Sequence, residues 1–160
     1  MRRQSIRLVL LLCLMLALSG CTDTGARAVY GDDARIAGDD CYQIGNFSGT
    51  VDESSYGGTF QNATGSRSLW VFDASAPESR TVDCTLSLEK GRAKLVLVSP
   101  GARVETLLEV SPSSPVDTSV LTLQLPAGES ILKLVMDGAS GMSIQLRFDG
   151  GRSYSAQDAP

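Results

Sequence analysis

The sequence predicts an all-β fold, an antiparallel β-sandwich with about seven to nine strands. Three observations lead to this prediction. Apolar and polar residues alternate with a period of two in several short segments, turn-forming residues separate these segments, and no segment has a helical period. A strand of this kind has one apolar face, which a second sheet must cover. We place the sandwich at residues 41–150.

The clearest strand begins near Val82 and ends near Leu88, with an apolar residue at every second position. The sequence at 89–92 has a glycine among charged residues and predicts a hairpin turn. The next strand, 93–98, is apolar on both faces, so we expect it to be central. The other expected strands are 47–51, 59–61, 68–73, 104–110, 120–125, 131–136 and 142–148.

The N-terminus has the order of an export signal. Arg2, Arg3 and Arg7 precede an apolar run of eleven residues from Leu8 to Leu18, and small residues follow. A helix that crosses the hydrocarbon core of a membrane needs about 20 apolar residues. The run is therefore a signal segment, and we expect residues 1–20 to be removed as a signal peptide.

Leu18, Ser19, Gly20 and Cys21 resemble the lipobox of bacterial lipoprotein precursors. The resemblance implies cleavage between Gly20 and Cys21, a diacylglyceryl group on the Cys21 thiol and, in many bacteria, a further acyl chain such as palmitate on its amine. Two or three chains make a durable anchor, whereas one does not. The protein is then extracytoplasmic, on the plasma membrane or, as Thr22 suggests for a two-membrane species, on the outer membrane. A secretory signal with Cys21 in a disulfide is the alternative.

Residues 21–40 are small, polar and acidic after the cysteine, so we expect a lipidated residue followed by a flexible tether. Residues 151–160 are predicted to be a disordered tail. Loss of residues 1–20 removes three arginines and leaves 11 basic and 18 acidic residues. This acidic balance disfavours nucleic acid and anionic lipid head groups as partners, because both require clustered Lys or Arg.

The mature chain has two cysteines besides Cys21, namely Cys41 and Cys84. An oxidising exterior favours a disulfide between them. The alternative is two separate buried thiols.

The sequence contains no histidine, which excludes catalytic triads and zinc sites built on imidazole. We expect no cofactor, no metal and no enzymatic activity. A hydrolase that acts on glycans with two carboxylates is the less favoured alternative. Five acidic residues at expected strand ends could contribute to a calcium site, although turn formation explains them better; they are Asp73, Asp83, Asp117, Asp137 and Asp149.

Trp70 has two roles open to it. An exposed indole could stack on a sugar ring, with Tyr42, Tyr56 or Phe72 beside it, whereas a buried indole would belong to the core. Leu69 and Val71 would face the opposite side of the same strand, so either this pair or Trp70 faces the core. A lone tryptophan in a small sandwich is more often a core residue, so we favour burial.

The last 40 or so residues resemble the end of bacterial pre-peptidase C-terminal and related jelly-roll domains. The resemblance is carried by three strands with Pro126–Glu129 and Asp137-Gly138 between them. The leading hypothesis for function is a non-catalytic module that binds or displays something at the cell envelope, with an envelope protein or a glycan as partner. The alternative is an assembly subunit of an envelope complex.

Overall fold

The structure is a computed structural model that describes residues 23–154, without the side chains of residues 23 and 116–118. This part of the chain contains two short helices and eight antiparallel strands, which confirms the predicted all-β class. The elements are α2 (Asp23–Arg27), α3 (Asp33–Ala37), β1 (Cys41–Val51), β2 (Ser55–Ala74), β3 (Glu78–Ser87), β4 (Lys90–Ser99), β5 (Arg103–Val110), β6 (Val116–Leu125), β7 (Gly128–Phe148) and β8 (Arg152–Ser153).

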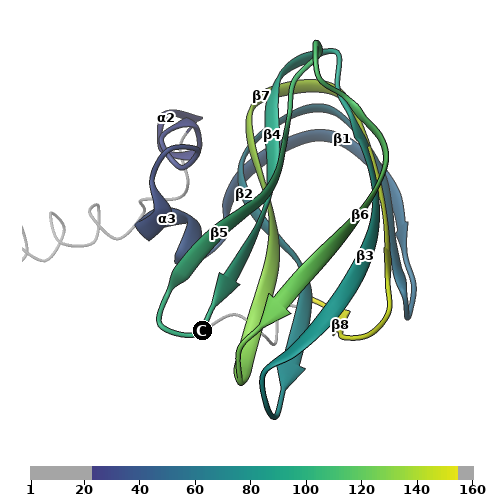
Figure 1. The fold of residues 1–160 in the computed structure, drawn as a ribbon. Helices are drawn as coiled ribbons and strands as arrows, with labels where there is room; N and C mark the ends of the chain where they lie inside the picture. Colours follow the sequence, from purple (N-terminus) through teal and green to yellow (C-terminus); the bar gives the residue numbers. More distant parts are fainter. Residues whose placement is uncertain (1–22, 155–160) are drawn as a thin grey trace, which may run out of the picture.

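Two long strands organise the sheet. β2 and β7 pair with each other along almost their whole length, and both bend in the middle. One half of β7 pairs with β3, and its other half pairs with β4. Beyond these lie β6 on β3, β5 on β4, and β1 and β8 on β2. The sheet therefore curves over itself, with β4 and β5 facing β3 and β6 across the core (Figure 1).

The bend in β7 corrects one predicted boundary. The sequence predicts a turn at Asp137-Gly138 between two strands, but the structure has a single strand that bends there. Gly138 has a φ of 57°, a left-handed conformation that glycine adopts without steric cost. Its N–H donates to Thr64 Oγ1 at 3.0 Å, which ties the bend in β7 to the bend in β2. The expected strands 59–61 and 68–73 likewise belong to one strand, β2.

The predicted hairpin at residues 89–92 is also wrong. β3 and β4 do not pair with each other, because each pairs with a different half of β7. The segment crosses from one layer of the sandwich to the other, and the Glu89 N–H donates to the Ser140 carbonyl at 2.9 Å. The expectation that the strand after this turn is central is confirmed, since β4 lies between β5 and β7.

The inner faces of the two layers form the main core. All strands from β1 to β7 contribute to it, which is the arrangement that the period-two alternation predicts. Its largest fully buried side chains are mostly leucine and aromatic: Trp70, Phe60, Phe72, Leu86, Leu95, Leu97, Leu123, Leu125, Leu132, Leu134 and Met136.

The predicted flexible tether is wrong for residues 23–40. These residues form α2 and α3, and Val29, Tyr30 and Ile36 are buried in a second cluster on the outer face of β4 and β7. Val96 and Val98 provide part of that face. The N-terminal segment therefore packs on the second apolar face of β4, which the sequence predicts. Figure 1 shows α2 and α3 outside the sheet. Neither helix among residues 23–154 is long and apolar enough to span a membrane.

A buried ion pair fixes this segment to the sheet. The Lys133 ammonium on β7 donates to the Gly38 carbonyl at 2.6 Å and to Asp40 Oδ1 at 3.2 Å. Asp40 in turn accepts hydrogen bonds at 2.8 Å from the backbone and the hydroxyl of Ser68 on β2. The Lys133 side chain is only 3% exposed. The end of the N-terminal segment is thus held by charge as well as by apolar packing.

The predicted disordered tail at 151–160 is wrong for its first residues. β8 pairs with β2, and the Tyr154 N–H donates to the Leu69 carbonyl at 3.0 Å. The rest of the predicted tail lies outside the described residues, as does the predicted signal peptide with Cys21.

The predicted disulfide between Cys41 and Cys84 is also wrong, because Cys84 is a free, buried thiol. Cys84 belongs to the inner core, whereas Cys41 packs against the outer cluster with α3. The two cysteines thus belong to different apolar clusters. The spacing of two cysteines in a sequence does not indicate which cluster each one joins. Burial raises the pKa of the Cys84 thiol to about 11, so the thiol is protonated at neutral pH.

Candidate functional site: an aromatic platform on the first two strands

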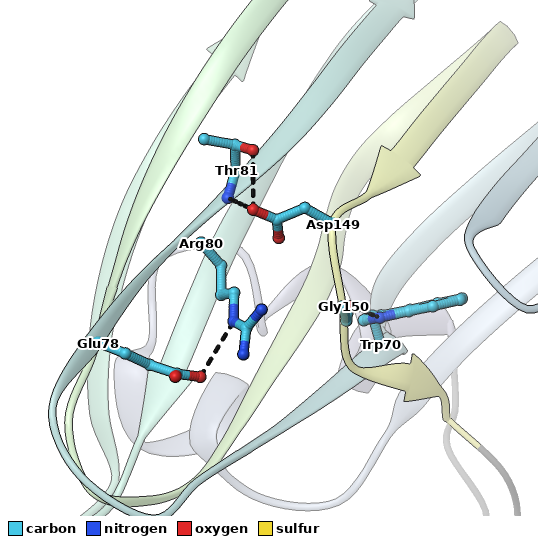
Figure 2. Close-up of polar contacts among 6 residues, drawn as sticks. All are labelled: Trp70, Glu78, Arg80, Thr81, Asp149 and Gly150. Atoms are coloured by element: carbon cyan, nitrogen blue, oxygen red, sulfur yellow. Dashed lines mark hydrogen bonds and ion pairs between the residues drawn. The ribbon is translucent and has the colours of Figure 1, made fainter.

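Trp70 belongs to the core, so the sugar-stacking role considered for it is wrong. Its side chain is fully buried, and its ring stacks on Phe148 with 3.9 Å between the centroids. The indole Nε1 donates to the Gly150 carbonyl at 2.9 Å (Figure 2). The face of the indole ring is covered and its N–H is hydrogen-bonded, so neither is available to a ligand.

The polar residues around Trp70 hold the chain in place after β7. Asp149 Oδ2 accepts hydrogen bonds at 2.9 Å from both the backbone and the hydroxyl of Thr81 on β3. Arg80 pairs with Glu78 at 3.0 Å on the same side of the segment (Figure 2). These contacts position Gly150, whose carbonyl accepts from Trp70. We assign this cluster a structural role.

The acidic residues considered for calcium are dispersed. In the part of the chain that the structure describes, no three Asp, Glu or Cys side chains come together as metal ligands. Asp137 pairs with Arg92 at 3.0 Å and Asp73 with Arg152 at 3.5 Å. The side chain of Asp117 lies outside the described residues.

The strongest candidate for a binding surface is a group of three rings around one guanidinium, which we call the aromatic platform. It consists of Tyr42 and Phe47 on β1 and of Tyr56 and Arg67 on β2. The Arg67 Cζ lies 5.6 Å from the ring centre of Tyr42, 5.1 Å from that of Phe47 and 6.0 Å from that of Tyr56. Tyr42 is 41% exposed and Phe47 39%, so two of the rings face solvent.

The local backbone explains how both exposed rings come to one side. β1 pairs only with β2, so it is an edge strand. Asn46 has a φ of 48°, in the left-handed region, and interrupts the alternation of β1. As a result Phe47 joins Tyr42 and Ile44 on the core side of the sheet, where Phe47 packs on Phe60 with 4.9 Å between centroids.

Glycines make room for Phe47 to lie close to the sheet. Gly49 on β1 and Gly58 on β2 face each other in the register of the two strands. A Cβ atom on Gly58 would lie 2.5 Å from Phe47 Cε2, and one on Gly49 would lie 2.7 Å from Phe47 Cζ. Any larger residue at either position would displace the ring. The glycine-rich sequence of these strands therefore supports a flat aromatic surface.

Two polar groups of the platform, the Arg67 guanidinium and the Tyr56 hydroxyl, lack hydrogen-bond partners within residues 23–154. Among the described residues, Arg67 contacts the three rings and makes no hydrogen bond or ion pair. The hydroxyl of Tyr56 is buried and has no partner either. Burial raises the pKa of Tyr56, and the nearby Arg67 charge acts in the opposite direction. A half-buried cation and a buried hydroxyl therefore lie in one place without the groups that would satisfy them.

Sequence reasoning identified this site only in part. Tyr42 and Tyr56 were considered as companions of Trp70, whereas Phe47 and Arg67 were missed. Phe72, the third companion considered, is buried against Phe148. The signal that was available is the set of glycines around Phe47, which leaves an aromatic ring on a strand with little else to cover it.

No protein-family model and no curated protein matches this sequence. Among solved structures, the chain is similar to a family 35 carbohydrate-binding module from Paenibacillus barcinonensis, with 13% identity, a TM-score of 0.41, and 68% of this chain and 92% of the other covered. It is also similar to a carbohydrate-binding module of a lichenase from Cellvibrio mixtus, with 13% identity, a TM-score of 0.40, and coverage of 68% and 88%. The protein PirA matches with 14% identity, a TM-score of 0.41, and coverage of 62% and 96%. Likenesses at this level assign neither a family nor a ligand.

Proposed function

We propose that this protein is a non-catalytic binding module of the bacterial cell envelope, anchored by lipid at Cys21, and that it binds glycans on the aromatic platform. The single observation that carries the binding role is the platform itself. Two rings more than a third exposed lie on one side of an edge strand and flank a guanidinium. Aromatic faces stack on the C–H faces of sugar rings, and arginine donates to sugar oxygens.

The platform is suited to an extended ligand. β1 is the edge of its layer, so a chain can lie along it without meeting a further strand. Tyr42 lies near the start of β1 and Phe47 near its middle, with Arg67 within contact of both rings. A polysaccharide would thus find two stacking positions with one hydrogen-bonding group between them.

Replacing Tyr42 by alanine tests the binding role. We expect the variant to bind cell-wall polysaccharide fragments at least about fivefold more weakly than the wild-type chain, because truncation of an aromatic contact residue typically costs more than 1 kcal/mol of binding. The measurement is titration calorimetry on residues 22–160, which include every described element. Because Tyr42 is exposed, its loss should leave the thermal midpoint nearly unchanged.

The matched control is Val120→Ala. Val120 is 62% exposed on β6, an edge strand of the same sheet, but it is not part of the platform. Its loss should leave glycan binding unchanged. Equal binding by wild type and the Tyr42→Ala variant would remove the platform from the function. Retention of an envelope protein instead of glycan would support the assembly-subunit alternative.

The lipid anchor is tested separately with Cys21→Ser in the full-length precursor. We expect wild-type protein to incorporate labelled palmitate and to lose residues 1–20, and the variant to do neither, because acylation and the cleavage that follows it both require the cysteine thiol. Incorporation of palmitate by the variant, or its absence from wild-type protein, would contradict the anchor.

A further inference from the structure

We propose that the aromatic platform selects saccharides that carry a carboxylate, with Arg67 as the group that binds it. This inference rests on the proposed glycan-binding function and names the class of glycan. Its basis is that Arg67 is the one group of the platform with a full charge, and that the described structure gives that charge no counter-ion.

Arginine in a folded protein normally satisfies its five N–H donors with carboxylates, carbonyls or water. Arg67 is half-buried, and its neighbours are aromatic rings, which attract a cation through their faces but accept no conventional hydrogen bond. Removal of water by these rings strengthens any ion pair that the guanidinium can form. The site can therefore accept an anion that the described part of the chain does not supply.

Four other arginines of the described residues are neutralised within the chain. Arg35, Arg80, Arg92 and Arg152 each form an ion pair with an acidic residue of this chain. The chain without residues 1–20 is also acidic overall, so its general field repels anions. The attraction of an acidic ligand to the platform would therefore come from the local charge at Arg67.

Tyr56 adds a second polar group at the same place. Its hydroxyl is buried without a hydrogen-bond partner, and its ring lies 6.0 Å from Arg67 Cζ. Buried groups of this kind are usually completed by a water molecule or by a ligand. The two exposed rings then determine which kind of molecule presents the anionic group. A sugar ring with a carboxylate can stack on Tyr42 or Phe47 and direct its charge toward the guanidinium, whereas a small inorganic anion gains nothing from the rings.

The test compares two probes with the same sugar rings and different charge. Trigalacturonate and its methyl ester have the same sugar rings, but the ester lacks the carboxylate charge. We expect wild-type protein to bind the acid at least about tenfold more tightly than the ester, because hydrogen bonds to charged groups are the strong ones. In N-acetylmuramic acid a lactyl group carries the carboxylate, so this probe shows whether the charge must be attached directly to the sugar ring. If wild-type protein binds it more tightly than N-acetylglucosamine, the proposal also holds for a carboxylate on a lactyl group.

The Arg67→Met variant should bind the acid and the ester equally, since methionine retains an apolar side chain but no charge. Arg67→Lys should restore part of the preference. Equal affinity of wild-type protein for acid and ester would overturn the inference while leaving glycan binding intact. Absence of binding to both probes and to every neutral glycan would instead overturn the proposed function. The comparison of acid and ester on wild-type protein needs no variant, so it holds even where Arg67→Met fails to fold.

Discussion

Replacing Trp70 by alanine is expected to lower the free energy of unfolding by about 3–5 kcal/mol, the usual cost of truncating a buried aromatic side chain. The ring is fully buried, stacks on Phe148, and donates to the Gly150 carbonyl. Its removal leaves a large cavity between the sheet and the segment after β7, and it also leaves that carbonyl without its donor. The measurement is urea-induced unfolding followed by circular dichroism, since Trp70 is the only tryptophan of the chain.

Trp70→Phe separates the two contributions. Phenylalanine retains much of the stacking on Phe148 but cannot donate to Gly150, so we expect a smaller loss of stability than with alanine. Both variants should bind glycans with wild-type affinity at temperatures where they are folded. A Trp70→Ala variant that is as stable as wild type but has lost glycan binding would show that the indole is a ligand contact, contrary to its position in the structure.

Replacing Lys133 by alanine is expected to destabilise the protein by about 3–5 kcal/mol, the range for breaking a buried ion pair by removing one partner. The variant leaves Asp40, only 19% exposed, without its cation and leaves the Gly38 carbonyl without its donor. The loss should be concentrated in residues 23–40, which this pair holds to the sheet. Hydrogen exchange measured by mass spectrometry should therefore show a larger increase in exchange rate, relative to wild type, in α3 than in β2 or β7.

Arg35→Gln is the matched control for this prediction. It removes an ion pair in the same segment, Arg35 with Asp32 at 3.2 Å, but both side chains are largely exposed. Exposed pairs contribute about 0–1 kcal/mol, so the variant should keep near-wild-type exchange in α3. If the Lys133→Ala and Arg35→Gln variants had equal effects, the segment would be held by apolar packing alone.

The strands could be predicted from the sequence because alternation of apolar and polar residues is a local signal. It places the inner core correctly around residues such as Leu86 and Leu134. The connections could not be predicted in the same way. The residues at 89–92 and at Asp137-Gly138 have the composition of turns, but whether such a segment reverses the chain or bends a strand depends on which distant strand pairs with it.

The N-terminal segment shows a second limit of local patterns. Its composition is that of a solvated spacer, and each helix is five residues long, too short to form without contacts elsewhere. It folds because Ile36 and Val29 meet the outer apolar face of β4, and because Lys133 and Asp40 lie together. The apolar face was visible in the sequence, but the segment that covers it was not.

The sequence could predict that aromatic residues form the candidate site, but not which of them are exposed. A single tryptophan attracts attention in a sequence, yet burial of large aromatic side chains is the usual outcome in a small sandwich. Tyr42 and Phe47 remain exposed because β1 is an edge strand, and this depends on strand order. The association of Arg67 with both rings depends on the register of β1 and β2.

Mapping by solution NMR shows directly whether glycans bind at the aromatic platform. Backbone amide shifts of residues 22–160 would be followed as polysaccharide fragments are added. The account predicts that the perturbed residues cluster on β1 and β2 around Tyr42, Phe47 and Arg67, with Trp70 unaffected. Perturbations confined to another part of the molecule, such as the edge strands β5 and β6, would contradict the assignment of the aromatic platform as the binding surface.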